Sequence, residues 1–153
     1  MLHKSFDFVK LVFFLKKFNI MLKLEHLGFA VKNLSEADEL YRRLLGTGPY
    51  KREKVPSEHV ITSFFKVGEV KIELLEATSN ESAIAGFIEK RGEGMHHVAF
   101  EVENIELEIQ RLRAEGFQII NEKPKKGADN KLVTFIHPKS TKGILVELCQ
   151  EIS

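Results

Sequence analysis

The chain has 153 residues, of which 43% are hydrophobic and 29% charged, as expected for a globular protein with one core or two small modules that share one. Its 23 basic and 22 acidic residues give a formal net charge of +1, so neither nucleic acid nor an anionic membrane is expected as a partner. The single cysteine, Cys149, excludes an internal disulfide, and this composition fits a reducing, cytoplasmic compartment.

Residues 1–20 differ in composition from the rest of the chain. Their longest apolar run, LVFFL, is far shorter than the ~20 residues that a membrane span requires, and no small-residue cleavage site follows it. One interpretation is an amphipathic helix that lies on a membrane surface. The better one is that the true start is Met21, directly before a predicted strand, so we treat 1–20 as an N-terminal extension and leave it out of the fold.

From Met21 onward, the pattern predicts a strand, a helix and three further strands. The strand LKLEHLGFAV has alternating apolar positions and is expected to end near Asn33. Ser35 is a suitable N-cap for the helix, and Gly46 is a suitable stop. The apolar face of this helix is predicted to consist of Ala37, Leu40, Tyr41 and Leu44. The three strands are expected near 49–55, 59–67 and 70–76.

The same order of elements returns in the second half of the chain. Residues 79–93 predict a linking helix that is capped at Ser79 or Asn80 and ends at Gly92. A strand that ends near Asn104 follows, and then a helix that stops at Gly116. The apolar face of that helix is predicted to consist of Ile105, Ile109 and Leu112. The three closing strands are expected near 117–122, 131–137 and 143–149.

These two halves form an internal repeat. An offset of 71 residues places His26 on His97 and Phe29 on Phe100. One strand–helix–three-strand unit exposes a face of a small sheet that it cannot bury alone. We therefore predict an α+β fold in which two paired βαβββ modules, 21–78 and 94–153, form a curved mixed sheet around a shared interior, with the helices outside.

Two adjacent histidines in GEGMHHVAFEV pose the question of which one lines this interior. Successive side chains of a strand point to opposite faces of the sheet, so His96 and His97 are not expected to share an environment. The repeat pairs His97 with His26, and it pairs His96 with Glu25. We therefore expect His26 and His97 to face the interior, and Glu25 and His96 to face away from it.

The last strand of each copy contributes a glutamate. VKIELLEA and GILVELCQ superpose on EL, which places Glu73 over Glu147. A buried carboxylate is costly unless it is paired, and imidazole and carboxylate together are ligands for divalent first-row metals. The pattern therefore predicts a divalent metal site made by His26, Glu73, His97 and Glu147. Four protein ligands leave two adjacent octahedral positions for water or a bidentate substrate.

Residues 22–150 resemble the vicinal oxygen chelate (glyoxalase-like) superfamily, and within it the methylmalonyl-CoA epimerase family. The segments that carry the resemblance are HLGFAVKNL, VGEVKIELLEATSNESAIAGFIEKRGEGMHHVAFEV, GADNK and FIHPKSTKGILVEL. The resemblance implies paired βαβββ modules with an open metal site, an isomerase activity on an acyl-CoA, and a homodimer. It places the metal on the same four residues and implies cobalt, manganese, nickel or zinc as the ion.

The chain departs from this family at two positions. Some epimerases have Gln where Glu73 stands, so the site here carries one more formal negative charge. Some also have a glutamate, proposed to act as a base, that corresponds to a position near Thr62. Because threonine cannot take up that proton, the candidate bases are Glu147 and Glu73. Glu58 or His59 would substitute if their loop folds inward.

The implied reaction needs an enolate and a site for coenzyme A. The proton between a thioester and a carboxylate is removed and returned to the other face, and a divalent metal acts as a Lewis acid where the enolate charge develops. The phosphates of coenzyme A need cations, for which KPKKGADNK and HPKSTK offer candidates. Lys131, Lys139 and Ser140 are the residues we assign to coenzyme A, and the further lysines nearby are Lys123, Lys125, Lys126 and Lys142.

Three other functions are compatible with the same fold. A lactoylglutathione lyase shares the ligand set and the enolate chemistry, and activity with a glutathione hemithioacetal would distinguish it. An extradiol dioxygenase uses two histidines and one carboxylate on iron, against which Glu73 argues. A small-molecule-binding protein that is not an enzyme needs no metal, so the complete four-ligand set argues against it, and metal analysis would identify it.

Overall fold

A computed structural model describes residues 21–153, so the expectations for 1–20 lie outside the described residues. The described chain forms one sheet of eight strands in the order β2-β3-β4-β1-β5-β8-β7-β6. The strands are β1 (Met21–Ala30), β2 (Lys51–Val55), β3 (Val60–Val67), β4 (Val70–Ala77), β5 (Gly94–Val102), β6 (Lys125–Lys126), β7 (Lys131–Ile136) and β8 (Leu145–Glu151). The helices are α2 (Leu34–Leu45), α3 (Ala83–Arg91) and α4 (Ile105–Ala114), with short 3₁₀ turns η1 (Pro56–Glu58) and η2 (Pro138–Ser140).

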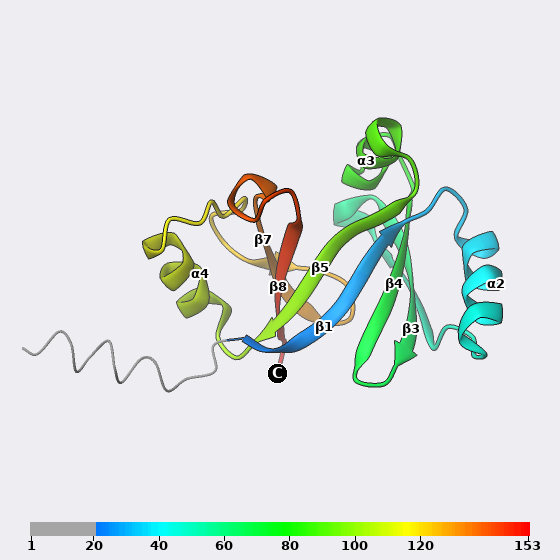
Figure 1. The fold of residues 1–153 in the computed structure, drawn as a ribbon, viewed down its shortest axis with the longest axis horizontal. Coiled ribbons are helices and arrows are strands. Elements are labelled where there is room, and N and C mark those ends of the chain that lie inside the picture. The colour runs from blue at the N-terminus through cyan, green and yellow to red at the C-terminus, as the bar shows by residue number, and fades with distance from the viewer. Residues whose placement is uncertain (1–20) are drawn as a thin grey trace, which may run out of the picture.

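From each edge to the centre, the strands of the two halves follow in the same order, β2-β3-β4-β1 and β6-β7-β8-β5. This arrangement confirms the predicted α+β class of two paired βαβββ units in a curved mixed sheet. At its centre, β1 runs antiparallel to β5. Each central strand then pairs in parallel with the last strand of its own half, β1 with β4 and β5 with β8. In Figure 1 the sheet curls between α2 and α4, which lie outside it at opposite ends.

The helix ends differ from the prediction at their starts. Asn33 and Asn104, which are 71 residues apart, are the N-caps of α2 and α4, and each side chain accepts a hydrogen bond of 3.0 Å from the backbone N–H three residues later. Ser35 therefore lies inside α2, contrary to the prediction. The linking helix begins after Ser82, later than predicted, because the Ser82 hydroxyl caps it. The predicted end at Gly46 is confirmed by its left-handed backbone.

The buried face of α2 is also different from the prediction. Leu40 and Leu44 are 53% and 71% exposed. The residues of α2 that pack on the outer face of the sheet are Leu34, Ala37, Tyr41 and Leu45, and they belong to a cluster that includes Phe65 and Leu74. The prediction is therefore confirmed for Ala37 and Tyr41 and wrong for Leu40 and Leu44.

The predicted strand at 117–122 forms only one bridge, between Ile119 and Ile136. The paired edge strand is the short β6, directly after Pro124. Proline has no backbone N–H to donate to a ladder, which is consistent with a broken edge at this point. In residues 21–153, no helix is long and apolar enough to cross a membrane.

The apolar clusters lie on the outer face, under the helices, and at one end of the interior. Ile105, Ile109 and Leu112 of α4 pack with Leu148 of β8 on the outer face. A separate cluster beneath α3 includes Leu75 and Val60 and borders the interior. This distribution leaves the concave face of the central strands to the histidines and glutamates.

Candidate metal centre

Two β-bulges in the central strands place the histidines. The pairing of β1 with β5 shifts by one residue between Leu24 and His26, which leaves Glu25 without a partner. It shifts again on β5, where His97 pairs with Gly28 but His96 is passed over. A bulge inserts one extra residue and breaks the strict alternation of side chains. The two bulges are 71 residues apart and so occupy equivalent places in the repeat.

These bulges overturn one prediction. Glu25 and His96 were expected to face away from the cavity, but both line it together with His26 and His97. Strict alternation predicted the opposite because it assumed a regular strand. A sequence signal was available, since a charged Glu25 inside an apolar strand next to a candidate ligand requires a buried partner.

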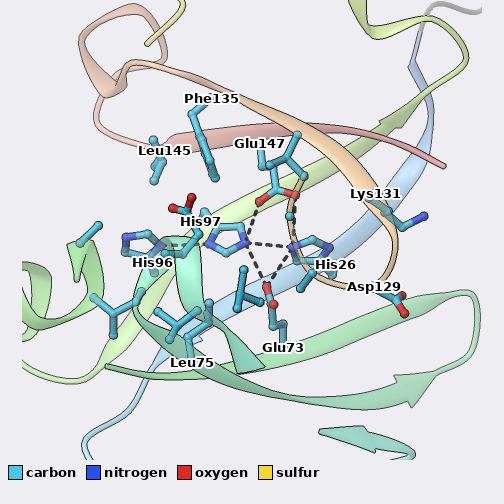
Figure 2. Close-up of a pocket in the computed structure, with 18 of the residues that line it drawn as sticks. His26, Glu73, Leu75, His96, His97, Asp129, Lys131, Phe135, Leu145 and Glu147 are labelled. Atoms are coloured by element: carbon cyan, nitrogen blue, oxygen red, sulfur yellow. Dashed lines mark hydrogen bonds and ion pairs between the residues drawn. The ribbon is translucent and has the colours of Figure 1, made fainter. Parts of the chain in front are cut away.

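The structure brings the four sequence-predicted metal ligands together (Figure 2). Nε2 of His26 lies 2.9 Å from Nε2 of His97. A Glu73 oxygen lies 3.2 Å and 3.4 Å from these two nitrogens, and Glu147 oxygens lie 3.9 Å and 3.5 Å from them. Figure 2 shows the two carboxylates approaching the imidazoles from opposite sides.

This donor set fits a divalent ion. Two ligand atoms that are each ~2.1 Å from an ion and at a right angle lie ~3.0 Å apart, close to the separation of the two imidazole nitrogens. His26, His97 and Glu147 each offer one atom within 4.8 Å of the others. All four side chains are buried, with residue exposures of 6% or less, so the charge of the carboxylates requires compensation inside the site.

The pKa values of the side chains in the site also favour a bound cation. Burial disfavours a charged His26 imidazole, but Glu147, Glu25 and Glu73 outweigh it and raise the pKa of His26 to about 10. Burial and neighbouring carboxylates raise the pKa of Glu147. The pKa of Glu73 is lowered despite its burial, because His26 and His97 both bond its carboxylate. Three carboxylates around one buried imidazole demand positive charge, which a divalent cation supplies.

Further side chains hold the ligands in place. Thr62, which is fully buried, donates a hydrogen bond of 2.9 Å to the second oxygen of Glu73. Nδ1 of His96 lies 2.9 Å from Nδ1 of His97, and the His96 ring packs edge-on against Phe87. Burial and the adjacent His97 lower the pKa of His96 to about 4, so His96 is neutral at pH 7. Thr62 thus orients Glu73, one of the candidate ligands.

Gly28 makes room for the His97 imidazole. A Cβ atom built at Gly28 would lie only 2.1 Å from Cε1 of His97. The two residues are direct partners across β1 and β5. Glycine is therefore required here by close approach of the His97 ring and not by a special backbone angle.

We predict that Gly28→Ala displaces the His97 ring. The overpacking should cost about 1–3 kcal/mol of unfolding free energy and weaken metal binding. Gly86→Ala in α3 is the matched control, because nothing lies within 4 Å of its added Cβ and alanine favours a helix. Thermal unfolding with and without metal checks both variants. Equal stability and metal affinity in Gly28→Ala and wild type would contradict the prediction.

The site opens into a cavity of about 270 Å³. Its walls are mostly apolar, and they include Val55, Val60, Phe64, Leu75, Ile84 and Phe135. Glu58 also lines the cavity, where it pairs with Lys125 at 2.6 Å. His59 instead lies 3.4 Å from Glu81, with its side chain 43% exposed. Of the two alternative bases, Glu58 alone is among the lining residues.

Of the three residues assigned to coenzyme A, only Lys131 lines the cavity, whereas Lys139 and Ser140 lie together on η2. Lys131 lines the cavity, but its side chain is only 4% exposed and lies within 4 Å of Glu25, Glu101 and Glu151. It compensates the buried Glu25 and the neighbouring Glu101 and Glu151, so this geometry does not favour the predicted assignment to phosphate binding. Lys139 is exposed on η2. The Ser140 hydroxyl accepts a hydrogen bond from the backbone of Gln118, outside the cavity.

Comparison with known proteins gives a consistent set of relatives. The family model of the glyoxalase/bleomycin resistance protein/dioxygenase superfamily matches residues 25–135. The uncharacterized protein YqjC of Bacillus subtilis is 38% identical over 85% of this chain and 93% of its own length. The mitochondrial methylmalonyl-CoA epimerase of Bos taurus is 38% identical over 84% and 74%. The crystal structure of the Mycobacterium tuberculosis methylmalonyl-CoA epimerase superposes with a TM-score of 0.84 at 30% identity, over 88% of this chain and 91% of that one.

Proposed function

The chain belongs to the glyoxalase/bleomycin resistance protein/dioxygenase superfamily, and on that premise we propose that it is an isomerase that interconverts (R)- and (S)-methylmalonyl-CoA. The observation that carries the proposal is the set of two histidines and two glutamates, buried together at the end of an apolar-walled cavity. Relatives named methylmalonyl-CoA epimerase support the choice of reaction.

The four donors His26, Glu73, His97 and Glu147 are proposed to hold a divalent metal. Imidazole with carboxylate suits cobalt, manganese, nickel or zinc. When bound, the ion supplies a Lewis acid for the oxygen on which the enolate charge develops. Relatives of this superfamily support a metal, and the choice among the four ions is part of the proposal.

The chain's own residues orient the substrate and move the proton. The apolar walls keep water from the carbon that loses the proton, and the two carboxylates lie on opposite sides of the imidazole pair. Glu73 has both oxygens engaged, by Thr62 and by the imidazoles. Within residues 21–153, the Glu147 carboxylate has polar contacts with the two imidazoles alone. We therefore assign the proton transfer first to Glu147, with Glu73 as the second candidate.

The remaining parts of the proposal concern coenzyme A binding, the oligomeric state, the location in the cell and the division into modules. Lys139 and Ser140, with the exposed lysines near them, are proposed to bind the coenzyme A phosphates. We propose a homodimer, because the edge strands of the sheet need cover. A cytoplasmic location is proposed from the reducing compartment that one buried cysteine, Cys149, suits. The units 21–78 and 94–153, joined at 79–93, are proposed as the duplicated modules.

The test is solvent deuterium exchange into methylmalonyl-CoA. Each epimer is incubated with the protein in deuterated buffer, first as purified, then after chelation, and then after each metal is restored. We expect exchange and epimerisation that are lost on chelation and regained with metal. No exchange at any metal, together with turnover of a glutathione hemithioacetal, would replace the proposal with a lyase of the same fold.

A further inference from the structure

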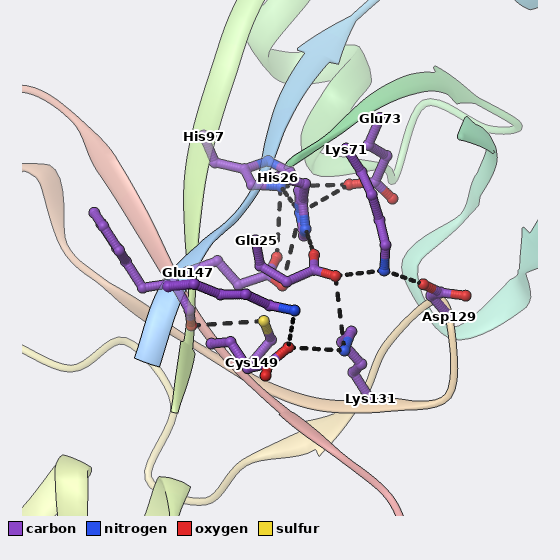
Figure 3. Close-up of polar contacts among 12 residues, drawn as sticks. Glu25, His26, Lys71, Glu73, His97, Asp129, Lys131, Glu147 and Cys149 are labelled. Atoms are coloured by element: carbon purple, nitrogen blue, oxygen red, sulfur yellow. Dashed lines mark hydrogen bonds and ion pairs between the residues drawn. The ribbon is translucent and has the colours of Figure 1, made fainter. Parts of the chain in front are cut away.

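We propose that Glu25 is the positioning residue for His26, and that Lys71 and Asp129 connect it to the loop at 127–130, so that metal affinity depends on that loop. The inference depends on the proposed function only in taking His26 as a metal ligand. It concerns three charged residues outside the donor set, whose contacts Figure 3 shows.

Glu25 contacts the side of His26 that faces away from the other donors. One carboxylate oxygen of Glu25 bonds Nδ1 of His26, while Nε2 of the same ring faces His97 and Glu73. A carboxylate on Nδ1 fixes the ring orientation and the tautomer that leaves Nε2 free for a metal. The bulge in β1 makes this contact possible, because it turns Glu25 to the same side as its neighbour.

Lys71 holds the other oxygen of Glu25. In the parallel pairing of β1 with β4, Lys71 is the direct partner of His26, and its ammonium bonds Glu25. The same ammonium lies 2.6 Å from Asp129. Glu25 is only 2% exposed, so its charge needs this compensation, and Lys131 adds a second cation at 3.7 Å.

Asp129 brings the second half of the chain to this contact. It lies in the loop between β6 and β7, where Gly127 and Ala128 line the cavity. Its carboxylate lies 3.0 Å from the Lys51 ammonium, and its backbone N–H donates a 3.0 Å hydrogen bond to Glu53. The loop is thus fastened to the first half of the sheet, and contacts run from Asp129 through Lys71 and Glu25 to the nitrogen of a metal ligand.

The experiment is a double-mutant cycle on Co²⁺ affinity, measured on the full chain by titration calorimetry and by the visible absorption of bound Co²⁺. Glu25→Gln should weaken binding by about 10–100-fold and shift the Co²⁺ spectrum, because it replaces the carboxylate that bonds Nδ1 of His26 with a neutral amide. Asp129→Asn should weaken binding by roughly 3–10-fold. The double variant should bind no more weakly than Glu25→Gln, because Asp129 acts through Glu25.

Asp38→Asn is the matched control, because it makes the same change as Asp129→Asn in a carboxylate that pairs with Arg52, outside the cavity and without contact to Lys71. Its affinity should stay within about twofold of wild type. The inference is overturned if Asp129→Asn matches this control, or if Asp129→Asn weakens the Glu25→Gln variant as much as it weakens wild type. Should Glu25→Gln fail to fold, Lys71→Met takes its place in the cycle.

Because Co²⁺ binding is measured without substrate, the two proposals fail separately. A wild-type protein that binds Co²⁺ and obeys the cycle but does not epimerise methylmalonyl-CoA refutes the proposed function alone. An active wild-type protein whose cycle is additive refutes the positioning role alone.

Discussion

His97→Ala is expected to abolish stoichiometric metal binding and to lower the rate of deuterium exchange by at least ~10³-fold. The variant loses one of four donors, and with the metal it loses several kcal/mol of stabilisation at the developing enolate charge, at about 1.4 kcal/mol for each factor of ten. The fold should survive, because His97 faces the cavity and the outer apolar clusters lie on the other side of the sheet.

His96→Ala is the comparison that makes this test specific. The two residues are adjacent and both line the cavity, but His96 contacts His97 and none of the other donors. We expect His96→Ala to retain the metal with an affinity about 10–100-fold lower, since it removes the partner that orients His97. Metal content by mass spectrometry and exchange rates check both variants. Loss of metal in His96→Ala with retention in His97→Ala would show that the assignment of the ligand is inverted.

The clustering of the four candidate ligands could be predicted from sequence because the chain repeats them. Each of the four side chains has an equivalent at nearly the same place in the other copy, so one weak signal is supported by another. The pairing of Asn33 with Asn104 at the same offset of 71 residues could also have been used for the helix starts. Residue type alone favours Ser35 as the cap, whereas the repeat favours Asn33.

The bulges could not be read from the repeat. Both copies carry one, at Glu25 and at His96, so the offset stays at 71 across them and the alignment shows no insertion. Alternation then gives the wrong side for both residues. The contact of Lys71 with Asp129 was equally hidden, because it joins two residues 58 apart that belong to different copies. Contacts between the copies depend on how the sheet curls, which periodicity does not encode.

Glu73 and Glu147 are the two candidates for the base, and their contacts distinguish them. Glu73 is held by Thr62 on one oxygen and by both imidazoles on the other. Moving Glu73 to take up a proton would break all of these contacts. Among the described residues, the Glu147 carboxylate has polar contacts with the imidazoles alone. It can therefore turn toward the substrate carbon at lower cost.

Glu147→Gln should therefore slow deuterium exchange by about 10²–10⁴-fold, the usual cost of losing a general base. Metal affinity should fall much less, because an amide oxygen still binds the ion but cannot accept the proton. Glu73→Gln is the matched control, with the same change at the equivalent place in the other copy. It is expected to reduce exchange far less, since the amide oxygen can face the imidazoles while the amide NH₂ donates a hydrogen bond to the Thr62 hydroxyl.

Each epimer has to be measured separately with metal saturating, because a base acts on one face of the substrate carbon. If Glu147 serves one face, exchange from one epimer should stop in Glu147→Gln before exchange from the other. If it serves both, the two rates should fall together. Exchange from both epimers at nearly the wild-type rate would eliminate Glu147, and the base would then be sought at Glu73 and Glu58, the other sequence-predicted candidates that line the cavity.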